Sequence, residues 1–294
     1  MKYVDIHSHL GFEDYGKDLD EVIKRMKDLN VGTISVGADL ESSKQAVKVA
    51  EENENIWACI GQHPNEKKDE VFDELEYEKL LKNLPEKILA DGKSEIFRAP
   101  SKKDDASAKT LTGEKVVAIG ECGLDYYVDP KFKVESEKLK VTEEEKERQK
   151  KLFIQQIEFA IIYNKPLMLH IRDAHDDAYE ILKNYKGKVR GNLHFFTSSL
   201  QTAKKFIELG FSISFPGIIT YVRDFDKVIK NIPLEMIHAE TDAPFASPIP
   251  HRGERNEPSY VIEVVKKIAE IREEDFERVR LQLLENAKRL FGIK

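Results

Sequence analysis

The feature that most constrains this chain is a regular alternation of short apolar runs with stretches of helical periodicity. The apolar runs end at Gly, Pro or polar residues, a pattern typical of strands that are covered on both faces. They lie at residues 3–9, 31–37, 56–62, 116–121, 167–170, 191–194, 211–214 and 236–240. Helices are predicted at residues 18–29, 40–54, 72–84, 142–163, 178–185, 200–209 and 225–229, with a final helical region from 257 to 290.

Eight strands alternating with helices within 294 residues predict an α/β fold, a (β/α)8 TIM barrel, as a single domain over residues 1–294. The alternative is an open doubly wound sheet, which usually carries a Gly-rich turn after its first strand. Residues 3–9 are not followed by such a turn. Two polar inserts interrupt the alternation: 85–115 after the third helix, expected away from the catalytic face, and 128–141 after the fourth strand, expected on it.

Composition narrows the class of protein. Charged residues make up 34% and hydrophobic residues 40%, which excludes disordered and collagen-like chains. The 47 Lys and Arg against 54 Asp and Glu give a net charge of −7, which argues against a basic nucleic-acid coat. No apolar run approaches the roughly 20 residues of a membrane helix, and no secretory h-region is visible. With only two cysteines, Cys59 and Cys122, we expect a cytoplasmic protein without a disulfide scaffold.

A candidate metal site begins with the sequence DIHSH at the end of the first predicted strand. Alternate side chains of a strand share a face, so His7 and His9 are expected to point together into the barrel mouth. Asp5 is expected one step deeper in the same row. Two imidazoles on one face suit a transition metal, whereas the alternative is two ordinary histidines near a strand end.

Further donors stand at the carboxyl ends of other predicted strands, where barrel enzymes keep their sites. They are Glu121 after the fourth strand, His170 after the fifth, His194 after the sixth and Asp242 after the eighth. Together with the first pair they exceed the needs of one tetrahedral ion, so the sequence predicts two divalent ions, Mg, Mn or Zn, bridged by Glu121. We assign His7, His9 and Asp242 to one ion, and His170 and His194 to the other. Glu121 and Asp242 are the predicted catalytic residues, the latter orienting or deprotonating the attacking water.

Several longer motifs run in order along the chain: DIHSHL (5–10), GQHP (61–64), AIGECGLDYY (118–127), KPLMLHIRDAHDD (165–177), NLHFFTSS (192–199), FPGIIT (215–220), ETDAPF (240–245) and PHRGERNEP (250–258). This set resembles the TatD-type metal-dependent deoxyribonuclease family, among the amidohydrolase-like metallohydrolase barrels. The resemblance implies a (β/α)8 barrel and a two-metal centre on the six donors named above. It also implies divalent-metal phosphodiesterase activity, mainly 3′→5′ exonuclease activity on DNA. The chain departs from the family pattern in its longer inserts, in HFFTSS where many members carry Cys and Gly, and at Cys122, where Ile is common.

Four residues are candidates for substrate binding. Arg172 shares a face with His170 and is suited to a phosphate oxygen, the alternative being a salt bridge with an aspartate that follows it. His63 resembles the family's His-Pro element and either contacts substrate, supports the metal ligands or stabilises a turn. Arg252 and Arg255 belong to the RGxxN element and either contact phosphate or tie down the last loop.

The hypothesis that accounts for these features is a hydrolase, a metal-dependent 3′→5′ exodeoxyribonuclease whose substrate is single-stranded DNA or a frayed 3′ end. The same dinuclear centre also suits an ester or amide hydrolase, such as a D-aminoacyl-tRNA deacylase. A third hypothesis, a barrel retained only for binding, is disfavoured by the intact donor set. We expect no membrane association and no obligate protein partner.

Overall fold

The computed structural model describes residues 1–65, 71–82, 115–128 and 141–294. Within these ranges, eight strands form one sheet whose spatial order is their sequence order, and every neighbouring pair is parallel. The strands are β1 (Tyr3–Ser8), β2 (Val31–Val36), β3 (Ile56–Ile60), β4 (Val116–Asp125), β5 (Leu167–Arg172), β6 (Gly191–Leu193), β7 (Phe211–Phe215) and β8 (Ile237–Ala239). This is the predicted (β/α)8 barrel.

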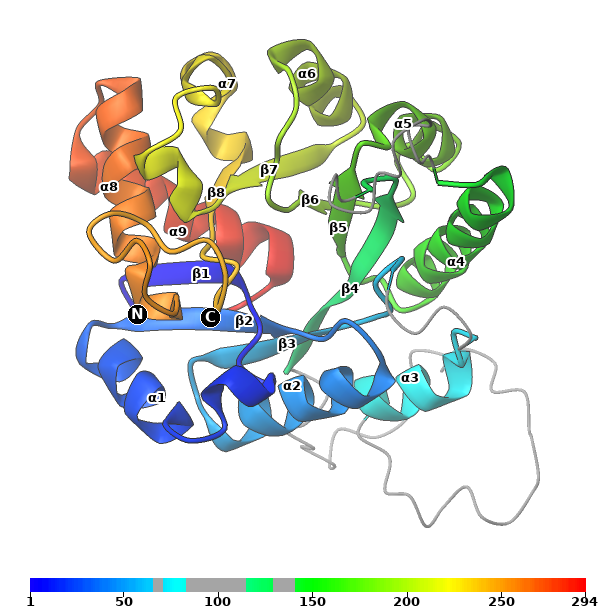
Figure 1. Ribbon diagram of the computed structural model, residues 1–294, viewed down its shortest axis with the longest axis horizontal. Helices are drawn as coiled ribbons and strands as arrows, with labels where there is room; N and C mark the ends of the chain where they lie inside the picture. The colour runs from blue at the N-terminus through cyan, green and yellow to red at the C-terminus, as the bar shows by residue number, and fades with distance from the viewer. Residues whose placement is uncertain (66–70, 83–114, 129–140) are drawn as a thin grey trace, which may run out of the picture.

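Helices surround the strands on the outside (Figure 1). They are α1 (Leu19–Asp28), α2 (Leu40–Glu52), α3 (Glu74–Lys82), α4 (Glu143–Ile162), α5 (His175–Lys183), α6 (Leu200–Glu208), α7 (Asp226–Asn231), α8 (Val261–Arg272) and α9 (Phe276–Phe291), with short 3-10 helices η1 (Glu13–Tyr15), η4 (Gly217–Thr220), η5 (Leu234–Met236) and η6 (Pro258–Tyr260). Side-chain capping explains where one of these helices begins. At α4, Thr142 Oγ1 accepts a hydrogen bond from the Glu145 backbone N–H at 3.1 Å, so the hydroxyl satisfies a free donor of the first turn.

The boundaries differ from the sequence prediction by more than two residues at three places. Strand β4 continues beyond the predicted end at 121 to Asp125. The final helical region is divided, because Glu273 adopts a left-handed conformation (φ 57°) that ends α8 before α9 begins. Helix α5 begins at His175 rather than at 178. Apart from residues 115, 128 and 141, the two predicted inserts, 85–115 and 128–141, lie outside the described residues.

The barrel interior is filled at the amino ends of the strands. Val4 and Ile6 of β1 belong to an apolar cluster with Trp57 of β3, and Leu284 and Phe291 of α9 complete it. Helix α9 therefore closes this end of the barrel, and the carboxyl ends of the strands remain available for a site. Within the described ranges, no helix combines the length and apolar character needed to cross a membrane.

The first and last strands are joined by few hydrogen bonds. His9 N donates to Ala243 O at 2.7 Å, and Asp242 N donates to His7 O at 2.9 Å. Deeper in the barrel, the buried Asp5 carboxylate accepts hydrogen bonds from Thr241 N at 2.8 Å and Thr241 Oγ1 at 2.6 Å. Asp5 thus fastens β1 to the segment that follows β8.

Candidate metal centre

Glu121 sits where the ladder between β4 and β5 shifts register, between Ile119 and Cys122. The preceding Gly120 has a φ of +149°, and a Cβ added there would lie 2.4 Å from Met168 O. Only glycine permits this close approach of the two strands. The irregularity places the Glu121 side chain, 5% exposed, at the centre of the carboxyl face.

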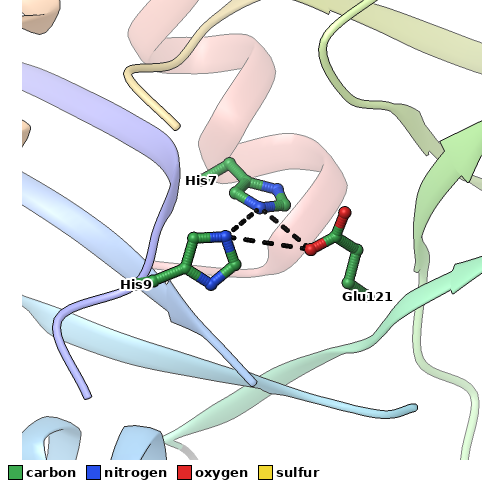
Figure 2. Close-up of side chains that lie close together, drawn as sticks. All are labelled: His7, His9 and Glu121. Atoms are coloured by element: carbon green, nitrogen blue, oxygen red, sulfur yellow. Dashed lines mark hydrogen bonds and ion pairs between the residues drawn. The ribbon is translucent and has the colours of Figure 1, made fainter. Parts of the chain in front are cut away.

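One oxygen of Glu121 faces the histidine pair of β1. Figure 2 shows His7 and His9 converging on this carboxylate, with Glu121 Oε2 lying 3.6 Å from His7 Nε2 and 3.8 Å from His9 Nε2. Asp242 Oδ1 approaches the same two nitrogens, at 3.7 and 3.5 Å. These side chains form the first donor group, and it has the composition that the sequence predicted for one ion.

The other oxygen of Glu121 faces the histidines of β5 and the loop after β6. Glu121 Oε1 lies 2.8 Å from His170 Nδ1 and 2.8 Å from His194 Nε2, and these two nitrogens are 3.2 Å apart. His63 Nε2 also approaches Oε1, at 3.8 Å. The structure therefore brings all the predicted donors together in two groups, with the carboxylate of Glu121 between them.

The hydrogen bonds of the outer ring nitrogens determine which atoms of His9 and His170 carry lone pairs. His9 Nδ1 lies 2.9 Å from Val36 O, a carbonyl that only accepts, so Nδ1 carries the proton and Nε2 presents a lone pair to the centre. His170 Nε2 donates to Asp125 Oδ2 at 3.2 Å, so Nδ1 faces the centre, where it donates to Glu121 Oε1 at 2.8 Å and would bind an ion once that proton is lost. Neutral imidazoles held by an outer acceptor are the usual ligands of divalent transition metals, so this donor set fits such ions.

His63 differs from these two histidines. Its Nδ1 accepts a hydrogen bond from Asn65 N at 3.2 Å, so in the neutral ring the proton is on Nε2, which faces the centre. Burial, followed by the charge of His170, lowers the pKa of His63 to about 3. A neutral ring in this tautomer presents a hydrogen-bond donor, which suits a substrate oxygen better than a metal ion.

Charge within the centre favours an ionised carboxylate. Burial alone would raise the pKa of Glu121, but the charge of His194 and the hydrogen bonds from His170 and His194 outweigh it and hold this pKa well below its usual value. Burial, followed by the charge of His194, lowers the pKa of His7 to about 4. Without an ion the centre thus combines an anionic Glu121 and a neutral His7 with a charged His194, whose proton an ion would displace.

Residues 4–292 match the family described as TatD related DNase. The chain belongs to this family. The uncharacterized metal-dependent hydrolase YabD of Bacillus subtilis is 37% identical, with 98% of each chain covered. The uncharacterized metal-dependent hydrolase YcfH of Escherichia coli K12 is 31% identical, covering 100% of this chain and 97% of that protein. The crystal structure of YjjV, a TatD homologue from E. coli K12, superimposes with a TM-score of 0.79 at 26% identity, over 100% of this chain and 99% of that one. The chain is therefore a metal-dependent hydrolase of the TatD-related family.

A cavity of about 460 Å³ opens beside the donors of this TatD-related barrel. Arg172 lines it, and the guanidinium carbon lies 3.5 Å from the centroid of the Tyr127 ring. Within the described chain, Arg172 makes no salt bridge with the aspartates that follow it, since Asp177 instead pairs with Lys150 at 3.0 Å. Aromatic residues Phe12 and Phe245 line the cavity beside His9.

The two arginines of the RGxxN element are not among the residues that line the cavity. Arg255 Nη2 forms an ion pair with Asp18 Oδ2 at 2.6 Å and fastens the last loop to the start of α1. Arg252 stacks on the ring of Tyr221, with 4.3 Å between the guanidinium carbon and the ring centroid. The loop-fastening alternative therefore describes Arg255, and substrate binding by either arginine stays a prediction.

The structure shows the partners of three residues that support the donors, which the sequence did not predict. Asp125, which orients His170, lies in the unpredicted extension of β4. Glu240 Oε1 lies 3.7 Å from His194 Nδ1 and accepts a hydrogen bond from Phe195 N at 2.6 Å, so it holds this histidine and its loop. Asp5 was expected in the row of His7 and His9. The β1–β2 register shift between Asp5 and Ser8 instead leaves its carboxylate bonded to Thr241 and to Thr33 Oγ1 at 3.2 Å.

Proposed function

We propose that this chain is a divalent-metal-dependent phosphodiester hydrolase that acts on DNA ends as a 3′→5′ exodeoxyribonuclease. The observation that carries the proposal is the placement of Glu121, with one carboxylate oxygen toward His7 and His9 and the other toward His170 and His194. A shared carboxylate between two groups of donors would suit a pair of divalent ions, which in phosphodiesterases stabilise the attacking and the leaving oxygen.

The two donor groups would each hold one ion, the first with Asp242 in addition. Bound divalent ions would lower the pKa of water and compensate the negative charge that develops on a phosphoryl group. Asp242 lies at the edge of the cavity, 9% exposed, with a left-handed φ of 56° that turns its carboxylate toward the histidine pair. This carboxylate is placed to accept the proton of the attacking water.

Substrate grip is assigned to Arg172 and His63. The guanidinium of Arg172 presents a planar set of donors to the cavity, and its stacking on Tyr127 restricts its orientation. A phosphate is the ligand that this geometry favours. His63 Nε2 adds a neutral donor on the same side of Glu121 as His170. The cavity volume lies within the range of small-ligand sites, which supports entry of a strand end rather than of a duplex.

The test is digestion of a 5′-labelled single-stranded oligonucleotide by the metal-loaded protein with Mg²⁺, Mn²⁺ or Zn²⁺. Wild type is expected to give a ladder shortened from the 3′ end, and Glu121→Gln is expected to give none. Glu235→Gln, on an exposed residue of η5, is the matched control and is expected to behave as wild type. An uncut oligonucleotide with all three ions would contradict the proposal, and bound metal in that protein would direct the search to esters and amides, including aminoacyl-tRNA.

A further inference from the structure

Two arginines differ from the other described arginines in the partners of their guanidinium groups. Every other described arginine donates a hydrogen bond or forms an ion pair with a carboxylate, a carbonyl or an amide oxygen. Arg172 and Arg252 have no such partner among the described residues, and each guanidinium lies over a tyrosine ring instead. Both follow strands at the carboxyl face, Arg172 at the end of β5 and Arg252 in the loop after β8. Arg172 belongs to the cavity already described, so Arg252 is the arginine of the described residues whose role remains to be assigned.

The loop after β8 connects the metal centre to Arg252. It begins at Asp242, whose carbonyl accepts a hydrogen bond from Phe245 N at 2.9 Å. It then packs against η4, where a Cβ on Gly217 would lie 2.4 Å from Ala246 O. Further along, Ile249 N donates to Thr220 Oγ1 at 2.9 Å. Tyr221 follows Thr220 in the sequence, and the guanidinium of Arg252 lies over its ring. The loop that leads from Asp242 to Arg252 is thus anchored on η4, both at Gly217 and at Thr220, the residue beside Tyr221.

Phe245 stands at the beginning of this loop. Its ring lines the cavity and meets the ring of His9 edge-on, with 6.2 Å between centroids, yet 52% of the residue is exposed. Ile249 is 48% exposed further along. A large aromatic ring that is packed along one edge and open on the remainder is a platform on which a nucleobase stacks.

We propose that Phe245, Tyr221 and Arg252 form a track for the single strand that leads out of the cavity, on the 5′ side of the scissile phosphate. Phe245 stacks a base next to the metal centre, and Arg252, held flat on Tyr221, contacts a backbone phosphate outside the cavity. The inference rests on the proposed phosphodiesterase function and adds the substrate class, a single strand longer than a dinucleotide.

Charge complementarity favours this occupant. The chain has a net charge of −7, so its average field repels a polyanion, and affinity for a nucleic acid must come from local cations and stacking. Arg252 needs no carboxylate partner to be displaced before it meets a phosphate. A planar cation on an aromatic face is also a common element of single-strand grooves.

The experiment compares KM for two substrates of the metal-loaded enzyme: an oligothymidylate of about ten nucleotides, within single-strand site sizes, and the dinucleotide of thymidine. Arg252→Gln is expected to raise KM for the longer strand about tenfold, equivalent to about 1.4 kcal/mol, with less than about a twofold effect on the dinucleotide. For Arg252→Gln, the slope of log KM against log salt is expected to fall by about 0.7, the share of one phosphate contact.

Phe245→Leu, which keeps an apolar side chain, is expected to raise KM for both substrates by at least about fivefold, since loss of one base stack costs about 1–3 kcal/mol.

Arg223→Gln is the matched control, because Arg223 lies two residues from Tyr221 but is ion-paired with Asp226 at 2.8 Å. It is expected to leave both KM values within about twofold of wild type. Equal effects of the two arginine substitutions, or equal effects of Arg252→Gln on long and short strands, would overturn the track. A protein that cuts neither substrate refutes the proposed function instead. In that event the track is tested by the fluorescence anisotropy of a labelled oligothymidylate mixed with the wild type or with Arg252→Gln. Weaker binding by the variant supports the track, and equal binding overturns it.

Discussion

His170 is held between two carboxylates: its Nε2 lies 3.2 Å from Asp125 Oδ2 and its Nδ1 lies 2.8 Å from Glu121 Oε1. Asp125 also accepts a hydrogen bond from Tyr127 N at 2.9 Å, through Oδ1. The outer carboxylate is therefore fixed in place and determines which nitrogen of His170 carries the proton. With Nε2 kept protonated by Asp125, Nδ1 is the nitrogen that would lose its proton and present a lone pair to an ion.

Replacing Asp125 with Asn is expected to weaken metal binding. The amide oxygen keeps the bond from Tyr127 N, so the amide N–H faces His170 Nε2 and moves the ring proton to Nδ1. Titration of the metal-free protein with Mn²⁺ or Zn²⁺ is expected to show an affinity about 10- to 100-fold lower. Asp177→Asn, whose carboxylate pairs with Lys150, serves as the control. Identical titrations of the two variants would refute this role of Asp125.

Removal of the metal is expected to lower the thermal stability of the wild type. An ion that binds only the folded chain, at a concentration of about 100 times its Kd, adds about 2.7 kcal/mol to the free energy of unfolding. For a chain of 294 residues, that corresponds to a Tm shift of roughly 4–5 °C. Calorimetry with and without a chelator measures the shift. In Glu121→Gln, most of this Tm difference is expected to disappear. A wild-type Tm that is the same with and without the chelator would argue against a bound ion.

His238 on β8 is expected to make the fold sensitive to acid. Burial, followed by the charge of Arg289, lowers its pKa to about 3, from 6.5 in the unfolded chain. Below pH 6.5 the unfolded chain takes up a proton that the folded chain excludes, so stability is complete above 6.5 and decreases as the pH falls toward 3. His238→Leu is expected to lose roughly 2 kcal/mol less between pH 7 and 5 than wild type. Urea unfolding at the two pH values tests this, and equal losses in both proteins would exclude His238 as the cause.

Asp5 is expected to be a principal stabiliser of barrel closure. Asp5→Ala leaves the buried N–H and hydroxyl of Thr241 without their acceptor, which is expected to cost about 3 kcal/mol or more. Asp5→Asn retains one acceptor oxygen, and the threonine hydroxyls can accept from its amide, so the loss is expected to be about 1 kcal/mol. Urea unfolding of the metal-free variants separates the two. Similar losses for Ala and Asn would show that the hydrogen bonds of Asp5 contribute little.

The barrel was predictable because its strands are covered on both faces, so near-continuous apolar runs mark them without any tertiary information. The donors were predictable for a related reason. The carboxyl ends of parallel strands meet on one face, so His170, His194 and Asp242 gather there even when strand limits are wrong by a few residues. The extension of β4 to Asp125 was missed, because glycines at 120 and 123 interrupt the apolar pattern while they allow the strands to come close.

The partners of long polar side chains were the least predictable part of the site. Arg172 and Arg255 both follow strands at the carboxyl face, and sequence spacing treats them alike. One lines the cavity and the other pairs with Asp18, a residue from the opposite end of the sequence. The outcome depends on which carboxylates the folded chain brings near, and that information is not local.

The fastening of β1 to the segment after β8 has a consequence for how the enzyme matures. Asp5 and Thr241 are 236 positions apart, and the same junction unites His7 and His9 with Asp242. A growing polypeptide that has left the ribosome only as far as β7 already carries the donor histidines of three strands, but it lacks the carboxylate that completes the first donor group. Closure of the first donor group therefore belongs to the last step of assembly, and an unfinished chain lacks a complete centre until its barrel is whole.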